Sequence, residues 1–270
     1  MTEQESVSDQ YSSGVLSHDV PTELDRLRLL EEHLDPVTLD VLGARAGELP
    51  ATARCLELGA GAGSVTRWMA GRFPAGTVTA VDIDVRYLDA SWAPNLEVRE
   101  GDLRLLDFPA GSFDLIHARA LFMHLPEREE LVKRVASWLA PGGWLVLEDI
   151  GNFPKATSPY PLWNKAMTAV ADLLSSQGED VGWARRRQPA ILADAGLVDL
   201  GLALEVFIVG DGGPTERFWR IFLGQLRPAL VARELITDAE IDAALALFGD
   251  PRFVDAAEAL VSAWGRQPAM

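Results

Sequence analysis

Cysteine is almost absent from this chain, with Cys55 the single one among 270 residues. A lone cysteine excludes a disulfide within the chain, and its place in a short apolar run predicts a buried thiol. Redox chemistry by cysteine is therefore excluded.

Lysine is also scarce, since only Lys133, Lys155 and Lys165 occur, and the formal net charge is −16. Nucleic-acid binding needs a surface that neutralises phosphates, and an anionic lipid surface attracts clustered basic residues. This composition therefore predicts neither nucleic acid nor membrane as a partner and favours a small-molecule substrate.

Long apolar stretches are also missing. No window reaches the roughly 18 uninterrupted apolar residues of a membrane span, and the polar, acidic N-terminus MTEQESVSDQ is unlike a signal peptide. We therefore expect a cytoplasmic protein. With 48% hydrophobic residues, the chain is long enough for one large domain with a cap.

The N-terminal part of the chain shows helical periodicity. Apolar residues recur every three or four positions from Leu24 to Leu34, and Asp35-Pro36 then predicts the start of a second helix by its N-cap and first-turn proline. We expect these two helices to cover an edge of the structure that follows.

The middle of the chain alternates short apolar runs with amphipathic helices. The clearest of these helices runs from Pro126 to Leu139 and is stopped by Pro141-Gly142-Gly143. This alternation predicts a parallel sheet with helices on both faces. The expected strands are 53–58, 78–81, 96–99, 113–117 and 144–147.

Beyond Ile150 the pattern is mainly helical. A capping box of Thr237 and Glu240 opens a helix that ends before Gly249. The other expected elements are helices at 183–195 and 215–230, an apolar helical stripe from 163 to 174, a strand at 197–209, and a last strand at 257–264.

The most informative motif is Glu57-Leu-Gly-Ala-Gly-Ala-Gly63, which joins the first expected strand to a helix at 64–73. Gly59, Gly61 and Gly63 lack a Cβ, so the chain can turn sharply and bring backbone N–H groups to a ligand at the helix N-terminus. This placement predicts a site for a nucleotide-type cofactor.

Two acidic residues refine that prediction. Asp82 ends the next strand, 19 positions after Gly63, where a carboxylate can accept both hydroxyl protons of a ribose. Asp102, in Gly101-Asp102-Leu103 after the third strand, can accept a hydrogen bond from the amino group of an adenine. The three strand ends together predict an adenosine-containing ligand.

With these motifs the chain resembles the class I S-adenosylmethionine-dependent methyltransferases, and within them the branch that acts on small metabolites and natural products. The resemblance rests on 57–63, on Val81-Asp82-Ile83-Asp84, on 101–103, on Phe113-Asp114-Leu115-Ile116 and on LAPGGWLVLE at 139–148. It implies an α/β fold: a Rossmann-like, doubly wound seven-stranded sheet whose last strand is antiparallel, with an N-terminal and an inserted helical cap.

The resemblance also implies an organisation of the chain. Residues 1–50 would form a lid and cap helices, 51–150 the cofactor-binding core, and 151–196 cap helices inserted after strand five. Residues 197–270 would complete the sheet, with a helical insertion at about 214–250.

By the same resemblance the cofactor is S-adenosylmethionine, leaving as S-adenosylhomocysteine, and no metal is expected. Glu57 and the backbone near Gly59 would hold its amino acid portion, and Asp82 with Ile83 the ribose. Asp102 and the Leu103 backbone would hold the adenine. Tyr11 and Arg119 are candidates for closing the site over the cofactor's carboxylate, although Tyr11 in an irregular tail can equally be idle.

On the acceptor side, His124 follows the fourth strand and suits a general base near neutral pH. Some sugar-hydroxyl methyltransferases that the chain resembles place a histidine and an acid at positions matching His124 and Asp149. The competing interpretation is that His124 packs or caps the helix beginning at Pro126 and that Asp149 has a supporting structural role.

Other residues admit two interpretations each. Arg185-Arg186-Arg187 can clamp an anionic acceptor, but a solvated, ion-paired helix face is favoured. The large apolar side chains of the cap are expected to divide between core and acceptor pocket: Trp163, Met167, Trp183, Phe218, Trp219 and Phe222. His117 and His33 are interpreted as core and surface residues, and His18 as a loop residue of the lid.

Two rival functions stay open. A nicotinamide-dependent oxidoreductase also places a ribose acid after a glycine turn, but no second mononucleotide half is evident. A cyclase-type enzyme or a non-catalytic partner subunit would keep the same cofactor site without transferring a methyl group. The acceptor, the atom methylated and the formation of a homodimer stay open as well.

Overall fold

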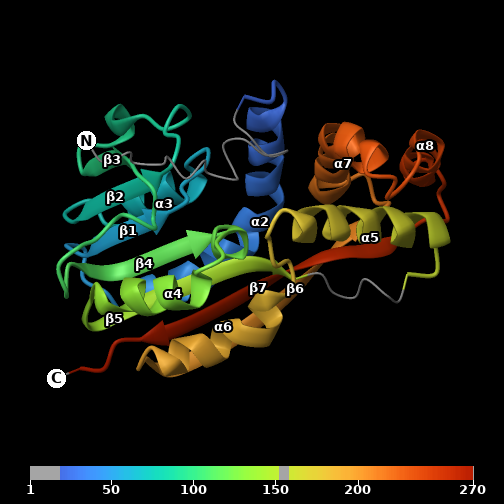
Figure 1. Ribbon diagram of the computed structural model, residues 1–270. Coiled ribbons are helices and arrows are strands. Elements are labelled where there is room, and N and C mark those ends of the chain that lie inside the picture. Colours follow the sequence, from blue (N-terminus) through green and yellow to red (C-terminus); the bar gives the residue numbers. More distant parts are fainter. Residues whose placement is uncertain (1–18, 152–157, 270) are drawn as a thin grey trace, which may run out of the picture.

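The computed structural model describes residues 19–151 and 158–269, and it contains one seven-stranded sheet of order β3-β2-β1-β4-β5-β7-β6 (Figure 1). β1 to β5 are parallel, and β7 runs antiparallel between β5 and β6. The expected α/β fold class and the position of its antiparallel last strand are confirmed. The strands are Arg54–Leu58 (β1), Thr77–Asp82 (β2), Leu96–Glu100 (β3), Phe113–Arg119 (β4), Leu139–Gly151 (β5), Val198–Val209 (β6) and Asp255–Arg266 (β7).

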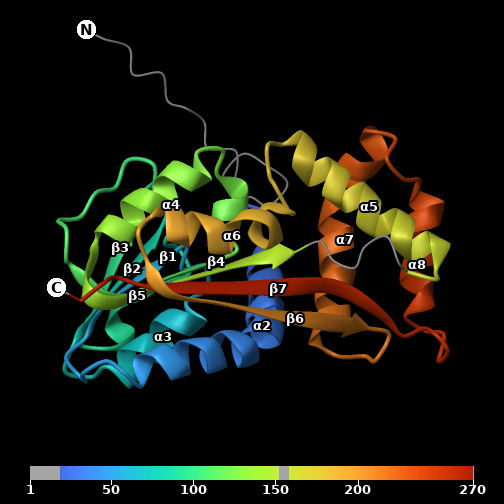
Figure 2. The same cartoon turned by 90° about the horizontal axis from the view of Figure 1, so that it is seen from below.

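Helices cover both faces of the sheet, as Figure 2 shows. On one face α4 and α6 share a core with β1, β4, β5 and β7. On the other face α3 and the C-terminal half of α2 pack on β1, β2 and β5. The helices are Glu23–Ala46 (α2), Ser64–Arg72 (α3), Arg128–Ser137 (α4), Pro161–Ser176 (α5), Trp183–Asp194 (α6), Pro214–Ala232 (α7) and Asp238–Leu247 (α8).

A second core lies beyond the C-terminal ends of the parallel strands, where α5, α7 and α8 pack together and the N-terminal half of α2 joins them through Leu29 and Leu30. These helices form the cap, at the right of Figure 1. The capping box at the start of α8 is confirmed, since Thr237 Oγ1 accepts from the Glu240 N–H and the Glu240 carboxylate accepts from the Thr237 N–H.

The prediction of two N-terminal helices was wrong. One helix, α2, runs through Pro36, and it crosses a face of the sheet instead of covering its edge. Asp35 is not an N-cap, because its carboxylate pairs with Arg119 and accepts from the Ser64 hydroxyl. Tertiary contacts on both sides of Pro36 thus outweigh the lost backbone hydrogen bond of the proline.

Two further expectations were wrong. α6 is not part of the cap, because Trp183, Ile191 and Leu192 belong to the core of the sheet. His33 is not a surface residue: it is 5% exposed, and its ring packs edge-on against Phe207 with centroids 4.6 Å apart. α6 and the helix that carries His33 are both covered by elements that are distant in sequence. Periodicity within one segment does not identify such a partner.

Candidate active site

The glycine turn between β1 and α3 requires glycine for two reasons. Gly59, Gly61 and Gly63 have φ values of 68°, 56° and 85°, in the left-handed region that other residues rarely adopt. In addition, a Cβ on Gly63 would lie 2.5 Å from the Trp92 ring. The turn therefore brings bare backbone to the N-terminus of α3, where a ligand can approach closely.

Asp82 ties this turn to the end of β2. Its carboxylate accepts from the Gly61 N–H at 2.8 Å and from the Asp84 N–H at 3.2 Å. Two N–H donors orient the carboxylate at the rim of the cavity, which Asp82 and Ile83 both line. The Asp82 carboxylate is therefore held in one orientation at the rim of the cavity, as the prediction of a ribose acid requires.

The residues after β3 line the same cavity. Gly101, Asp102 and Leu103 are part of its wall. Burial by itself would raise the pKa of Asp102, but hydrogen bonds from the Arg104 side chain and N–H outweigh it and hold the pKa below its ordinary value. The carboxylate is thus ionised and already oriented by Arg104 from the side.

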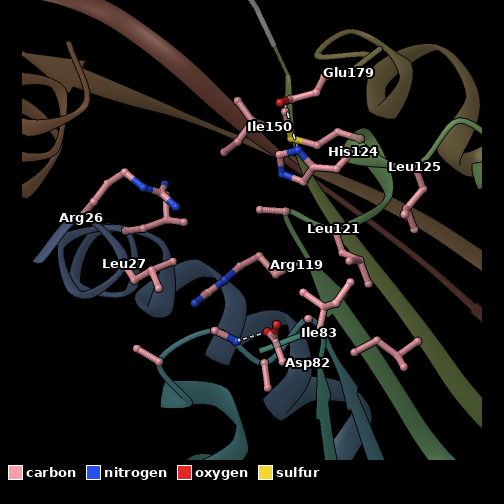
Figure 3. A pocket seen from close by; sticks show the side chains of 18 of the residues that line it. Arg26, Leu27, Asp82, Ile83, Arg119, Leu121, His124, Leu125, Ile150 and Glu179 are labelled. Atoms are coloured by element: carbon pink, nitrogen blue, oxygen red, sulfur yellow. Dashed lines mark hydrogen bonds and ion pairs between the residues drawn. The ribbon is translucent and has the colours of Figure 1, made fainter. Parts of the chain in front are cut away.

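One continuous cavity joins this sheet edge to the cap. Figure 3 shows Asp82 and Ile83 at one end of it, Arg119 in the middle, and His124 and Glu179 at the other end. Its far wall comes from α2, α5, α7 and β7, through residues such as Leu27, Leu30, Met167, Val170, Leu174, Phe218, Trp219, Phe222 and Glu258.

Directly beneath the glycine turn lies a buried triad that the sequence did not reveal. His117 Nδ1 is 2.9 Å from Glu57 Oε2, and His117 Nε2 is 3.2 Å from Glu148 Oε2. Burial alone would lower the pKa of His117, but the two carboxylates outweigh it and raise the pKa to about 9. His117 is therefore a cation at neutral pH that holds Glu57 in place.

His117 was expected in the core, and it lies there, fully buried. Its partners were not foreseen. The available signal was charge within buried strands. Glu57 and His117 are register partners on β1 and β4, and Glu148 on β5 is the register partner of Arg119, two positions beyond His117. Glu148 also accepts from the hydroxyls of Thr38 and Ser262, so it binds α2 and β7 to the triad.

Arg119 lies at the end of β4 and lines the cavity. Its guanidinium pairs with Asp35 at 2.9 Å and donates to Thr38 Oγ1 at 2.9 Å. Both partners are on α2, so this helix fixes Arg119 beside the glycine turn. Its expected companion Tyr11, and His18 of the expected lid, lie outside the described residues.

His124 faces Glu179 across the cap end of the cavity, and both side chains line it. The residue ends a short 3₁₀ helix, Phe122–His124, after β4, and its Nδ1 is 3.0 Å from Glu179 Oε2. Glu179 lies in the segment between α5 and α6, whose Asp180 N–H donates to Met123 O at 2.9 Å. The structure thus supplies His124 with an acidic partner that the sequence did not indicate.

Asp149 does not line the cavity. Its carboxylate accepts from Trp183 Nε1 at 3.2 Å, from Gln188 Nε2 at 3.0 Å and from the Met123 N–H at 3.4 Å. Burial raises the pKa of Asp149 to about 7, although the nearby His124 and these donors oppose the rise. Because its carboxylate accepts from the Met123 N–H, Asp149 supports the turn that carries His124 from outside the cavity lining.

The remaining candidates divide as expected. Arg186 pairs with Asp180 and Arg187 with Glu129, and none of the three consecutive arginines lines the cavity. Of the large apolar residues, Met167, Phe218, Trp219 and Phe222 line the cavity, whereas Trp163 and Trp183 belong only to the cores.

Comparison with known proteins gives this site its family. A family model described as "Methyltransferase domain" matches residues 30–179, more than half of the chain. The chain belongs to the class I S-adenosylmethionine-dependent methyltransferases. The methyl donor of these enzymes is S-adenosylmethionine.

Individual relatives agree. The chain is 30% identical over 155 residues to methyltransferase str2 of Strobilurus tenacellus, covering 54% of each protein. It is 29% identical over 208 residues to trans-aconitate 2-methyltransferase of Deinococcus radiodurans, covering 65% of this chain and 79% of that one. The match to the first relative thus spans about half of its length.

A solved structure of geranyl diphosphate methyltransferase with bound S-adenosylmethionine has the same fold. It superposes with a TM-score of 0.54 at 14% identity and covers 94% of each chain. At this identity the likeness establishes the fold alone.

The methyltransferase site fits S-adenosylmethionine by its own geometry. The glycine turn, the Asp82 carboxylate and the residues after β3 lie along one wall of one cavity, as an adenosine with an attached amino acid requires. The antiparallel β7 beside β5 is not the sixth parallel strand of a dinucleotide-binding sheet. This topology removes the nicotinamide-dependent alternative.

Replacing Asp82 with alanine is expected to weaken binding of S-adenosylhomocysteine by about 1–3 kcal/mol, because a buried charge-assisted acceptor and the anchor of the Gly61 N–H are lost together. Isothermal titration calorimetry measures the change. Asp84→Ala is the matched control, since the Asp84 carboxylate pairs with Arg86 and does not line the cavity. Equal affinities of Asp82→Ala and wild type would refute the assignment of the ribose acid.

Proposed function

We propose that this methyltransferase transfers the methyl group of S-adenosylmethionine to a small molecule bound in the cap end of the cavity. The observation that carries the proposal is the continuity of the cavity from the glycine turn to His124 and the cap helices. A macromolecular acceptor would need an open surface, whereas α2, α5 and α7 wall this end.

When bound, S-adenosylmethionine supplies a methyl group activated by a positively charged sulfur. For such a reaction the protein contributes mainly alignment, which can supply roughly 7–11 kcal/mol of barrier lowering. Asp82, Asp102 and the triad-held Glu57 orient the donor from the sheet edge. The apolar cap wall orients the acceptor and excludes water.

His124 is the proposed general base for an acceptor hydroxyl or ammonium group. Because Glu179 Oε2 lies 3.0 Å from His124 Nδ1, the nitrogen that we assign to the acceptor is Nε2. For a hydroxyl acceptor, His124 Nε2 takes the proton as the bond from oxygen to the methyl carbon forms and the carbon–sulfur bond breaks. An ammonium acceptor would first give its proton to Nε2, because only the resulting amine has a lone pair for the attack. Glu179 lies beside the imidazolium in both cases. Asp149 has a positioning role behind this pair.

We further propose that the acceptor belongs to secondary metabolism, as the resemblance to the small-metabolite and natural-product branch of the family implies, and that the enzyme acts in the cytoplasm. Its net charge of −16 and the scarcity of lysine support this over a nucleic-acid or membrane-bound substrate. In the part of the chain that the structure describes, no helix is long and apolar enough to cross a membrane.

The test is an assay with S-adenosylmethionine carrying a deuterated methyl group and a panel of phenols, alcohols and amines with apolar bodies. Mass spectrometry should detect products heavier by one labelled methyl group, with one S-adenosylhomocysteine formed for each. Product formation from an acceptor without transfer of the label would instead support a cyclase-type reaction. Binding of S-adenosylhomocysteine without turnover of any panel member would contradict the proposal for these acceptor classes.

A further inference from the structure

The cap end of the cavity has a charge pattern that bears on the acceptor. Resting on the proposed function, we infer that the acceptor is an uncharged or cationic, largely apolar molecule and that the site rejects anionic ones. The evidence is the set of charged side chains at that end and the partners that each one has.

Two carboxylates line the acceptor end. Among the described residues, Glu179 pairs with His124. Glu258 on β7 accepts from Trp219 Nε1 at 2.5 Å, and its other oxygen lies 3.1 Å from His33 Nε2. Glu258 is 4% exposed. Both carboxylates thus line this end of the cavity, and within residues 19–151 and 158–269 each is paired with a histidine and not with an arginine or lysine.

The arginine at this end already has its positive charge balanced by a neighbouring carboxylate. Arg26 lines the cavity, but Glu23 holds its guanidinium with two contacts, at 2.8 and 2.6 Å, and Gln225 in turn donates to Glu23 at 3.1 Å. The other arginines of the lining, Arg104 and Arg119, are paired with Asp102 and Asp35 near the donor end.

The rest of the acceptor wall is apolar. Methionine, leucine and valine side chains from α5 face aromatic rings from α7, among which Phe218 and Phe222 stack with centroids 5.1 Å apart. A carboxylate or diphosphate placed here would lose its hydration among apolar groups and meet like charges. A hydroxyl or ammonium group could instead donate a hydrogen bond to one of the two carboxylates.

This inference separates the chain from other methyltransferases named above. Trans-aconitate and geranyl diphosphate, the compounds in the names of two of them, carry several negative charges. The arginine cluster that would suit such charges, residues 185–187, lies outside the cavity. Family membership therefore does not carry the anionic acceptor over to this protein.

The experiment is a calorimetric titration of the full chain, saturated with S-adenosylhomocysteine, with octanol, octylamine and octanoate. These share one apolar body and differ in head-group charge. Octylamine and octanol should bind, and octanoate should bind about tenfold more weakly or worse, because it meets two carboxylates. Glu258→Gln should reduce the difference in binding affinity between octanoate and octanol.

Glu240→Gln is the matched control, because that carboxylate pairs with Lys165 on α5 and does not line the cavity. Octanoate binding as tightly as octanol, or no binding by any of the three, would overturn the inference. Failure of S-adenosylhomocysteine itself to bind would count against the proposed function, so the two failures are distinguishable.

A separate observation concerns the edge strand β6. Its alternate residues present an uncharged apolar stripe, and each of these side chains is between 38% and 48% exposed. In the described sheet β6 is the last strand and pairs only with β7. The stripe, called the β6 stripe below, consists of Val198, Leu200, Leu202, Leu204, Val206 and Ile208.

We propose that β6 pairs with β6 of a second copy of this chain to form a homodimer. An antiparallel pair centred on Ala203 would set Leu202 opposite Leu204 and Leu200 opposite Val206, each contact occurring twice about the two-fold axis. On the other face Glu205 would lie opposite Gly201, so no two acids meet across the pair.

The strand is self-complementary in a second way. Register irregularities against β7 fall between Val198 and Gly201 and between Val206 and Ile208, at nearly equal distances from Ala203. A straight central segment is therefore left between them for pairing. For a chain of net charge −16, this uncharged stripe is where two copies approach with the least repulsion.

Sedimentation velocity across the micromolar concentration range tests the dimer. Wild type should sediment as a dimer, and Leu202→Glu as a monomer with an unchanged circular dichroism spectrum. Leu105→Glu replaces an apolar side chain that is 85% exposed and outside the stripe, so it should stay dimeric. A monomeric wild type, or a Leu202→Glu variant that is still dimeric, would overturn the proposal.

Discussion

His124→Ala is expected to lower the turnover number about 100-fold or more while the affinity for S-adenosylhomocysteine stays at the wild-type value. The variant removes the proposed base at the cap end of the cavity, and the donor contacts around Asp82 lie at the other end. Steady-state kinetics with a hydroxyl acceptor, paired with calorimetry, measure the two quantities.

Glu179→Gln tests the same pair of residues with a smaller change. It keeps the shape of the residue beside His124 but removes its negative charge, so turnover should fall less than in His124→Ala. If His124 only packs the turn before α4, its loss should lower thermal stability and leave turnover unchanged. Wild-type turnover in His124→Ala would thus establish the structural interpretation.

His117→Ala is expected to lower the free energy of unfolding by about 3–5 kcal/mol at neutral pH, because it leaves Glu57 and Glu148 as buried carboxylates without their shared cation. Denaturant unfolding followed by circular dichroism measures the change. Cofactor affinity should fall as well, since Glu57 lines the cavity and loses its anchor. A loss below about 1 kcal/mol, within the range of an ordinary substitution, would contradict the charged triad.

The same triad predicts a pH dependence. The pKa of His117 is about 9 in the folded protein and 6.5 for an ordinary histidine. A raised pKa means that protonation favours the folded state, so the contribution is complete below about pH 6.5 and is lost as the pH rises through 9. The stability difference between wild type and His117→Gln should therefore shrink over that interval, and a difference independent of pH would refute it.

Much of the fold could be predicted because local patterns coincide with tertiary roles. The glycine turn, the acid at the end of β2 and the box that caps α8 each act within a few residues of their own position. Even β7 was predictable as a strand from its apolar run. Its antiparallel place between β5 and β6 came from the family resemblance and not from the run itself.

Other parts depend on contacts across long sequence separations. Pro36 indicates a helix start locally, yet α2 continues because Asp35 meets Arg119 and Thr38 meets Glu148. His33 is polar on an amphipathic helix, yet Phe207 and Glu258 bury it from β6 and β7. In each case the deciding partner lies far along the chain, and no pattern within one element encodes it.

By itself, the sequence predicted an adenosine-containing ligand along the ends of parallel strands, from the spacing of Gly59 to Gly63, Asp82 and Asp102, because each motif belongs to one strand end. The family resemblance then identified that ligand as the methyl donor. Only the tertiary structure decided the acceptor end. In the fold His124 lies beside Glu179, and Asp149 lies outside the cavity lining. Glu258 and Arg26 come from opposite ends of the chain and line the same cavity. Such a site is made by packing between distant helices, and packing is a property of the folded chain.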